Sequence, residues 1–326
     1  MSTEIMVSPI RGVDPVVKTF LDKINSTRGP QIYQMSPGEA RAALLKIQNV
    51  KVPELVTDTE DLSIPDGPKG AVQIRIIRPK GAEEKLAAIM YFHGGGWVLG
   101  DKNTHDRLVR EISTRTNSAV IFVDYSRSPE AMYPIAVEEC YIATRYVAQN
   151  AEQLNIDPSR LIVAGDSVGG NMATVVSMMA KQRKRPKIGM QILFYPVTDS
   201  NFDTSSYRQY ANGYWLSREA MKWFWDQYLP EKSKRSEPMA SPLQASADQL
   251  LGLPEALVIT DEFDVLRDEG EAYARKLIES GVKVAAIRCL GTIHDFMMLN
   301  ALSRAPATRC AIDLACDMIK SFGAVG

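Results

Sequence analysis

Apolar and polar positions alternate in blocks along most of this chain. From Val72 onward, short runs rich in β-branched and aromatic residues are separated by longer segments in which apolar residues recur at helical spacing. Such runs predict buried strands joined by crossover helices, hence an α/β fold with a mostly parallel sheet and helices on both faces. The predicted strands lie near 72–78, 86–92, 119–124, 161–165, 190–195, 256–261 and 283–290, and the predicted helices near 103–117, 134–150, 168–183, 266–281 and 306–322.

Two stretches fall outside this alternation. Residues 1–50 predict two amphipathic helices, and the second opens with Ser36-Pro37-Gly38-Glu39, a capping box with proline at the first helical position. Residues 200–242 hold a dense group of tyrosine, tryptophan and phenylalanine side chains. Part of this second stretch has the spacing of one more helix packed on the core, with its apolar face made by Met221, Phe224, Trp225 and Tyr228.

A serine in a G-x-S-x-G pattern lies between a predicted strand and a predicted helix. Gly165-Asp166-Ser167-Val168-Gly169 follows the apolar run 161–164 and precedes a helix of small residues. A serine on so sharp a turn projects its hydroxyl above the sheet edge, and the glycines accommodate the crowded backbone. The pentapeptide alone is a weak signal, and a plain turn serine is the alternative. In this context we interpret Ser167 as a candidate nucleophile.

Three consecutive glycines follow an earlier predicted strand. His93-Gly94-Gly95-Gly96-Trp97 comes directly after the run that ends at Phe92. Glycine triplets cost conformational entropy, so we expect their backbone N–H groups to face something bulky or charged. In acyl transfer such donors hold the oxyanion, together with the amide of the residue after the nucleophile. We favour this interpretation over a flexible glycine hinge.

A serine nucleophile needs a base, and the chain offers three histidines. His93 belongs to the glycine loop, where its ring is expected to brace that loop. His105 lies at a polar helix start and is expected to be a solvated surface residue. A lone histidine after a strand is more often structural than catalytic, but the two earlier motifs make His294 the best-placed base.

Several acids follow the predicted strand 256–261. Asp261 ends that strand and is expected to make local backbone hydrogen bonds. Asp268 and Glu269 fall in the first turn of the next helix, where the macrodipole favours negative charge. Asp264 lies on the loop between them and is our choice for the carboxylate that orients the imidazole.

The order of nucleophile, acid and base is that of α/β-hydrolases, and four motifs carry a closer resemblance. The chain resembles a hormone-sensitive-lipase-like carboxylesterase in its His-Gly-Gly-Gly loop, Gly-Asp-Ser-x-Gly-Gly elbow, Asp-x-Leu-x-Asp acid loop and Gly-x-x-His-x-Phe base loop. A segment at 124–130 resembles the family's Tyr-Arg-Leu-Ala-Pro-Glu, with departures at Ser126 and Arg127. Val168 and Val265 stand where alanine and proline are commoner. These departures remove no catalytic group.

The resemblance implies an α/β-hydrolase fold with a helical cap over the active site. Residues 1–50 would form N-terminal cap helices, 51–199 and 243–326 the catalytic domain, and 200–242 an inserted cap segment. It also implies a serine carboxylesterase that acts on short- to medium-chain carboxylic esters. The expected site consists of the triad Ser167, Asp264 and His294, the oxyanion-hole amides of Gly94, Gly95 and Val168, and the candidate substrate-binding residues Trp97, Tyr195 and Trp215.

Two rival functions stay open. An amide or carbamate hydrolase would use the same catalytic residues. A small-molecule binding protein would keep the fold without the chemistry, as plant gibberellin receptors do. Those receptors have lost the base, whereas His294 is present here, so this second rival is the weaker one.

Composition narrows the partners. The 38 basic and 39 acidic residues nearly balance, which predicts no nucleic-acid partner and no anionic membrane surface. The one basic run, Lys181–Lys187, suits a solvated helix terminus. The four cysteines show no metal or disulfide spacing, no signal peptide is evident, and no apolar run approaches the roughly 18 residues of a membrane span. We expect a cytoplasmic enzyme without metal or cofactor, whose partner is a small-molecule ester and which is a candidate homodimer.

Overall fold

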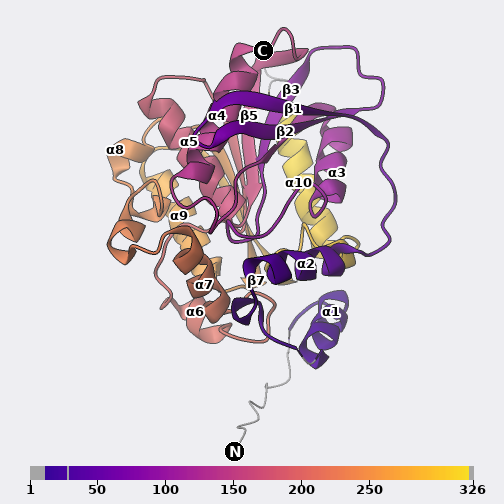
Figure 1. The fold of residues 1–326 in the computed structure, drawn as a ribbon, viewed down its shortest axis with the longest axis vertical. Coiled ribbons are helices and arrows are strands. Elements are labelled where there is room, and N and C mark those ends of the chain that lie inside the picture. The colour runs from indigo at the N-terminus through magenta and orange to yellow at the C-terminus, as the bar shows by residue number, and fades with distance from the viewer. Residues whose placement is uncertain (1–11, 28, 323–326) are drawn as a thin grey trace, which may run out of the picture.

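The buried runs of the sequence form one eight-stranded sheet in the computed structural model, which describes residues 12–27 and 29–322 (Figure 1). The first two neighbouring pairs in the sheet are antiparallel, and the five that follow are parallel. From edge to edge the order is β1 (Thr57–Gly67), β2 (Gly70–Pro79), β4 (Ser118–Asp124), β3 (Leu86–Phe92), β5 (Ile156–Asp166), β6 (Met190–Phe194), β7 (Glu255–Phe263) and β8 (Val284–Ile293).

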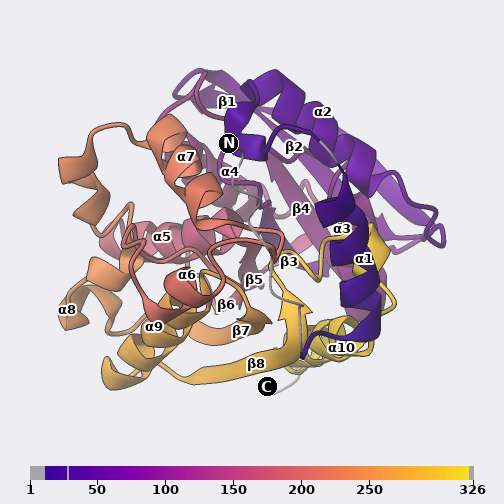
Figure 2. The same cartoon turned by 90° about the horizontal axis from the view of Figure 1, so that it is seen from below.

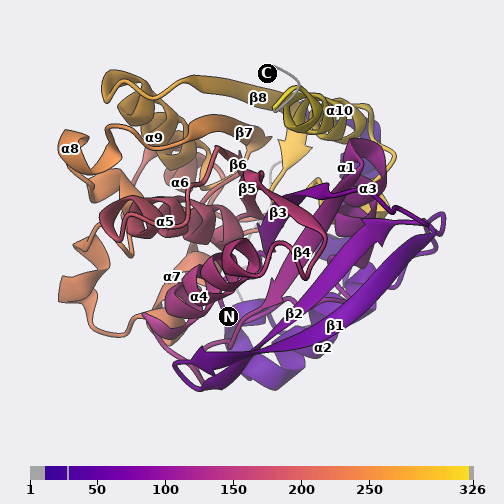
Figure 3. The same cartoon turned by 90° about the horizontal axis from the view of Figure 1, so that it is seen from above.

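Helices cover both faces of this sheet (Figure 3). One face carries α3 (Asp106–Thr116) and α10 (Pro306–Ser321), and the other carries α4 (Ile135–Gln149), α5 (Val168–Gln182) and α9 (Arg267–Glu279). The short elements are α8 (Ala247–Leu250) and the 3-10 turns η2 (Lys232–Ser236), η3 (Pro242–Gln244) and η4 (Asn300–Leu302). The predicted parallel sheet with helices on both faces is therefore confirmed.

The central strands are rich in apolar residues because both of their faces are covered. Every residue of β3 and β6 is buried, which is typical of parallel strands between two helical layers. Helix α5 is buried from Val168 to Ala180, and its small residues let it lie close against the strands. This close packing fixes the position of the residue at the start of α5.

The sequence prediction missed β1. This strand carries four acidic residues, a proline and a glycine, and Ile64 is its one buried side chain. It pairs with β2 on one side and is the edge of the sheet on the other. An edge strand with few buried positions leaves little hydrophobic pattern to detect, and charged residues and proline are common on such edges.

Five elements gather at the end of the sheet where the parallel strands terminate (Figures 1 and 2). The elements are α1 (Pro15–Ser26), η1 (Ile32–Gln34), α2 (Pro37–Gln48), α6 (Ser205–Gln209) and α7 (Arg218–Tyr228).

The predicted capping box at the start of α2 is confirmed, since Ser36 Oγ accepts the Glu39 amide at 3.3 Å and Glu39 Oε2 accepts the Ser36 amide at 2.8 Å.

The N-terminal helices contact both the inserted segment and the loops beneath it. Phe20 of α1 packs on Trp215 with ring centroids 5.3 Å apart. Arg41 of α2 donates to the Val98 carbonyl at 2.8 Å, and Gln48 donates to the Met298 carbonyl at 2.9 Å. Segments distant in the sequence thus meet above one end of the sheet.

Helix α7 packs as the spacing of its apolar residues predicts. Its buried side chains include all four of the predicted face, and Tyr228 stacks on Trp97 with centroids 3.9 Å apart.

None of the helices in the described ranges combines the length and apolar character needed to cross a bilayer. All four cysteines are free thiols in the structure, and Cys140, Cys289 and Cys316 are buried.

Candidate active site

Ser167 lies on a strained turn between β5 and α5. Its backbone has φ 56° and ψ −121°, a conformation that L-residues rarely adopt. Glycine is required on both sides. A Cβ on Gly169 would lie 1.9 Å from the Phe92 carbonyl oxygen, and one on Gly165 would lie 2.4 Å from the Gly169 backbone. The predicted sharp turn is therefore present, and close backbone contacts hold it.

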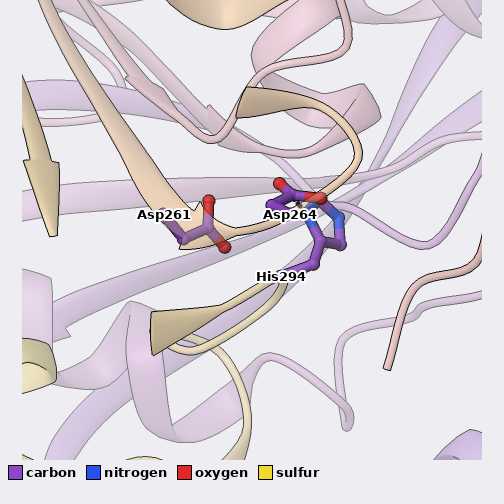
Figure 4. Close-up of side chains that lie close together, drawn as sticks. All are labelled: Asp261, Asp264 and His294. Carbon is purple, nitrogen blue, oxygen red and sulfur yellow. Dashed lines mark hydrogen bonds and ion pairs between the residues drawn. The ribbon is translucent and has the colours of Figure 1, made fainter. Parts of the chain in front are cut away.

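The three residues predicted as nucleophile, base and acid form one hydrogen-bonded chain. His294 follows β8 and places Nε2 2.9 Å from Ser167 Oγ. Asp264 follows β7 and places Oδ2 2.8 Å from His294 Nδ1. Figure 4 shows these two side chains directed toward each other. Asp264 is itself fixed, because its other oxygen accepts the Leu266 amide at 3.1 Å. All three side chains are almost fully buried. This arrangement can pass the serine proton to a fixed imidazole.

The surrounding carboxylates make His294 more basic. Burial lowers the pKa of His294, but Asp264 and Asp295 together raise it above the ordinary value of 6.5. These negative charges stabilise the protonated imidazole that forms when the serine gives up its proton.

Gly94 does not offer the free amide that the sequence prediction required. Its N–H donates to Asp166 Oδ1 at 3.1 Å, so the prediction for Gly94 as an oxyanion donor is wrong. The next two glycines have φ +105° and +63°, and their amides have no hydrogen-bond partner within the described ranges. Val168 is the first residue of α5, where amides lack an acceptor in the helix. The amides available to an anion are those of Gly95, Gly96 and Val168.

Asp166 joins the nucleophile turn to the glycine loop, and sequence reasoning gave it no role. Besides the Gly94 amide, its carboxylate accepts the Tyr91 hydroxyl at 2.8 Å and lies 3.2 Å from His105 Nε2. Burial raises the pKa of Asp166, but His105 and Tyr91 outweigh burial and lower it below its ordinary value. The sequence feature that could have indicated this role is the position of an acid directly before the nucleophile. A carboxylate buried there must accept hydrogen bonds from nearby donors.

The expectation of a solvated His105 is wrong, because this side chain is fully buried. Asp166 raises the pKa of His105 against the lowering effect of burial, which favours an ion pair between them. His93 does brace the glycine loop: its ring stacks on Tyr125 with centroids 4.1 Å apart, and Nδ1 lies 2.8 Å from the Gly94 carbonyl oxygen. Burial lowers the pKa of His93 to about 3, so its ring is neutral.

The acidic residues around Asp264 differ in burial and hydrogen bonding from what the sequence predicted. Asp261 is fully buried, and neither of its carboxylate oxygens has a hydrogen-bond partner within residues 12–27 and 29–322, so the expected local backbone bonds are absent there. Burial and the nearby Asp264 raise the pKa of Asp261, which favours an uncharged carboxyl. Asp268 and Glu269 do fall in the first turn of α9, but Glu269 is buried and accepts the Thr198 amide at 2.7 Å.

Asp261, Asp264 and His294 are also the one group of potential metal ligands in the described part of the chain, with ligand atoms within 4.8 Å of one another (Figure 4). His294 Nδ1 and Asp264 Oδ2 face each other at 2.8 Å. A cation between them would have to break the contact that orients the imidazole.

The three candidate substrate-binding residues occupy different places. Tyr195 lies beside the base, with its ring centroid 4.9 Å from that of His294. Trp215 is partly exposed, and its Nε1–H donates to Asp295 Oδ2 at 2.9 Å. Trp97 is fully buried between rings of α7, so the structure does not support its predicted contact with substrate.

The sequence and the fold of this chain are similar to those of known hydrolases and esterases. Residues 89–298 match the family model described as the alpha/beta hydrolase fold. A putative alpha/beta hydrolase of Acanthamoeba polyphaga mimivirus is 43% identical over 94% of this chain and 88% of its own. An ethyl acetate hydrolase of Pseudomonas putida is 36% identical over 74% of this chain and 76% of its own. The crystal structure of a thermostable esterase from Pseudomonas putida has a TM-score of 0.94 and 44% identity, and covers 97% of this chain and 99% of that one.

The basicity of His294 leads to a prediction about pH. The base must be unprotonated to accept the serine proton, so a pKa raised above 6.5 moves the acidic limb of kcat/KM above pH 6.5. By linkage, the stability that the charged imidazole contributes is complete below about pH 6.5 and is lost as pH rises through the folded pKa. Measuring kcat/KM for a neutral ester against pH checks this, and a limb with its midpoint below pH 6 would contradict it.

Three matched acid-to-amide changes test the choice of Asp264. Asp264→Asn should lower kcat by roughly 10⁴, the effect of the wrong imidazole tautomer in a serine protease. Asp261→Asn should lower it far less, because Asn resembles an uncharged carboxyl. Asp268→Asn removes the negative charge of the group that accepts the Ser206 amide at 2.8 Å but leaves a carbonyl oxygen to accept it, so it should cost at most about 1 kcal/mol of stability with little loss of kcat. If Asp264→Asn has the mildest effect of the three, the acid is misassigned.

Proposed function

The chain belongs to the α/β-hydrolase family and is a carboxylic ester hydrolase, and we propose that it cleaves its ester through an acyl-enzyme on Ser167. One observation carries this proposal. The hydroxyl, imidazole and carboxylate that such chemistry needs stand in a continuous chain with contacts of 2.9 and 2.8 Å. The hormone-sensitive-lipase-like motifs of the sequence contain all three groups.

The first half of the reaction forms the acyl-enzyme. His294 Nε2 removes the proton of Ser167 as Oγ attacks the ester carbonyl, and Asp264 holds the imidazole with Nδ1–H directed at its carboxylate. The carbonyl oxygen becomes an oxyanion, for which we assign the amides of Gly95, Gly96 and Val168. The protonated His294 then gives its proton to the departing alkoxide, which leaves as the alcohol.

The second half releases the acid. A water molecule gives a proton to His294 and attacks the acyl carbonyl, and the same amides hold the second oxyanion. Collapse of this intermediate breaks the bond to Ser167 Oγ, which takes the proton back from His294. No other group is needed to balance the protons.

We propose that the described part of the predicted N-terminal cap, residues 12–27 and 29–50, forms with residues 200–242 a cap that limits access to the site; residues 1–11 of the predicted cap lie outside the described ranges. Ser167 is only 4% exposed beneath these segments, and Phe224 of α7 lies against the glycine loop, where a Cβ on Gly96 would lie 2.1 Å from its ring. Phe20 and Trp215 join the two segments. An aromatic cover of this kind excludes water and suits uncharged groups, so we propose short- to medium-chain carboxylic esters as substrates.

Amide or carbamate hydrolysis by the same residues is the remaining rival. A matched pair such as 4-nitrophenyl acetate and 4-nitroacetanilide separates the two, because both release a coloured product from the same acetyl group. A binding protein would cleave neither. Cytoplasmic location and a homodimer stay predictions, which fractionation and sedimentation would test.

Ser167→Ala should abolish hydrolysis of 4-nitrophenyl acetate, since loss of the nucleophile in a comparable triad costs on the order of 10⁶ in kcat. Ser177→Ala is the matched control. This serine is buried on α5, the helix that Ser167 precedes, and its hydroxyl donates to the Ala173 carbonyl at 2.9 Å. The control should keep wild-type turnover, and both variants should keep the native circular dichroism spectrum. More than a few per cent of wild-type turnover in Ser167→Ala would reject the proposal.

The cap leads to a second prediction. Deleting residues 1–40 removes the contact between Phe20 and Trp215. The truncation should lower activity and alter acyl-length preference, with a smaller effect on the melting temperature. Phe20→Ala should shift the preference in the same direction. Leu45→Ala, at a position 40% exposed on α2, should leave it unchanged. An unchanged profile of 4-nitrophenyl esters in a soluble truncated protein would remove the N-terminal helices from the site.

A further inference from the structure

Asp295 lies next to the base, and it forms no bond and moves no proton in the proposed mechanism. Its backbone has φ +66°, and Oδ1 lies 3.5 Å from His294 Nε2. This is the nitrogen that faces Ser167 Oγ at 2.9 Å, whereas Asp264 contacts the opposite nitrogen. A carboxylate therefore stands on the side of the imidazole at which the ester must react.

The cap segment holds this carboxylate in place. The second oxygen of Asp295 accepts Nε1–H of Trp215 at 2.9 Å, and Trp215 in turn packs on Phe20. The Asp295 side chain is 15% exposed, against 3% for His294 and 0% for Asp264. Among these three neighbours, Asp295 has the most surface open to an incoming molecule.

No lysine or arginine among the described residues forms an ion pair with Asp295, whose one charged contact is His294. Arg107 contacts the segment that follows Asp295 and is directed away from its carboxylate, since it donates to the Met298 carbonyl at 3.1 Å and pairs with Glu111 at 3.4 Å. When His294 is neutral and ready to act as base, the Asp295 carboxylate keeps its hydrogen bond from Trp215 but has no cationic partner in contact with it among the described residues. A negative group on the substrate would meet this charge directly.

We propose that Asp295 is a specificity-determining residue that excludes esters carrying a negative charge near the scissile bond. The substrates of the site are then neutral or cationic esters. This inference rests on the proposed function, because it assumes that Ser167 and His294 cleave the ester. Two unit charges about 5 Å apart at an effective dielectric constant near 20 repel each other enough to lower kcat/KM on the order of 100-fold.

The test compares matched neutral and anionic esters at about pH 9. Dimethyl and monomethyl succinate differ in charge on the acyl side, and methyl acetoxyacetate and acetoxyacetate differ on the alcohol side. The measured quantity is the ratio of kcat/KM, neutral over anionic, in the wild type and in Asp295→Asn. Any effect of the substitution on the basicity of His294 is shared by both esters of a pair and largely cancels in that ratio.

Asp295→Asn should lower the ratio at least tenfold in one pair or both. A smaller fall in both pairs overturns the inference. Asn tolerates positive φ well, so the fold should persist, and Asp295→Gly provides a second neutral variant that also suits φ +66°. If the wild type shows no Ser167-dependent cleavage of the neutral esters, the proposed function itself has failed, which is a different result.

Asp317→Asn is the matched control, because it removes one negative charge from α10 on the far side of the sheet. Asp317 is 69% exposed and pairs with Lys320. The end of α10 packs beside Gly189, which precedes β6, whereas Ser167 follows the opposite end of the neighbouring strand β5. Over that distance salt screens the charge, so the ratios in Asp317→Asn should equal those of the wild type.

Discussion

The active site depends on the close contact between the nucleophile turn and the end of β3. Gly169 approaches the Phe92 carbonyl so closely that even one methyl group would lie 1.9 Å from it. This contact sets Ser167 beside the glycine loop, and the Asp166 carboxylate then joins the two by accepting the Gly94 amide. The strained backbone at Ser167 persists because the buried helix α5 and the covered strands around it leave no alternative position.

Charge is distributed unevenly around the base. Asp264 and Asp295 raise the pKa of His294. Asp264 is hydrogen-bonded to the ring, and Asp295 is held by Trp215 at the exposed side. Asp261 is buried without a hydrogen-bond partner among the described residues, and its raised pKa favours an uncharged carboxyl. The imidazolium that forms during catalysis is thus stabilised from both of its nitrogens. The same charges that favour the transition state also make the site hostile to an anionic substrate.

Local patterns were sufficient for part of this structure. The elbow, the glycine loop and the capping box at Ser36 each depend on neighbours within a few residues, so the sequence alone could predict them. The buried strands were predictable for the same reason. The base was assigned to His294 only because the elbow and the glycine loop made it the best placed of the three histidines. What the sequence could not reveal depends on distant contacts. His105 is a polar residue in a polar segment of the sequence. Its burial is compensated by Asp166, 61 residues away, whose carboxylate lies within hydrogen-bond distance of the ring nitrogen Nε2. Gly94 and Gly95 look alike in sequence, and only the position of Asp166 distinguishes their amides.

The central claim is that Ser167 is the residue acylated by the substrate and that His294 activates it. Reaction with a neutral alkyl 4-nitrophenyl phosphonate, followed by proteolysis and mass spectrometry, tests this most directly. We expect one phosphonyl group on Ser167, no stoichiometric labelling of Ser167→Ala, and labelling of His294→Ala slowed by a factor on the order of 100 or more, the scale at which a general base contributes. A label on another residue, or equal labelling rates in the wild type and His294→Ala, would contradict it.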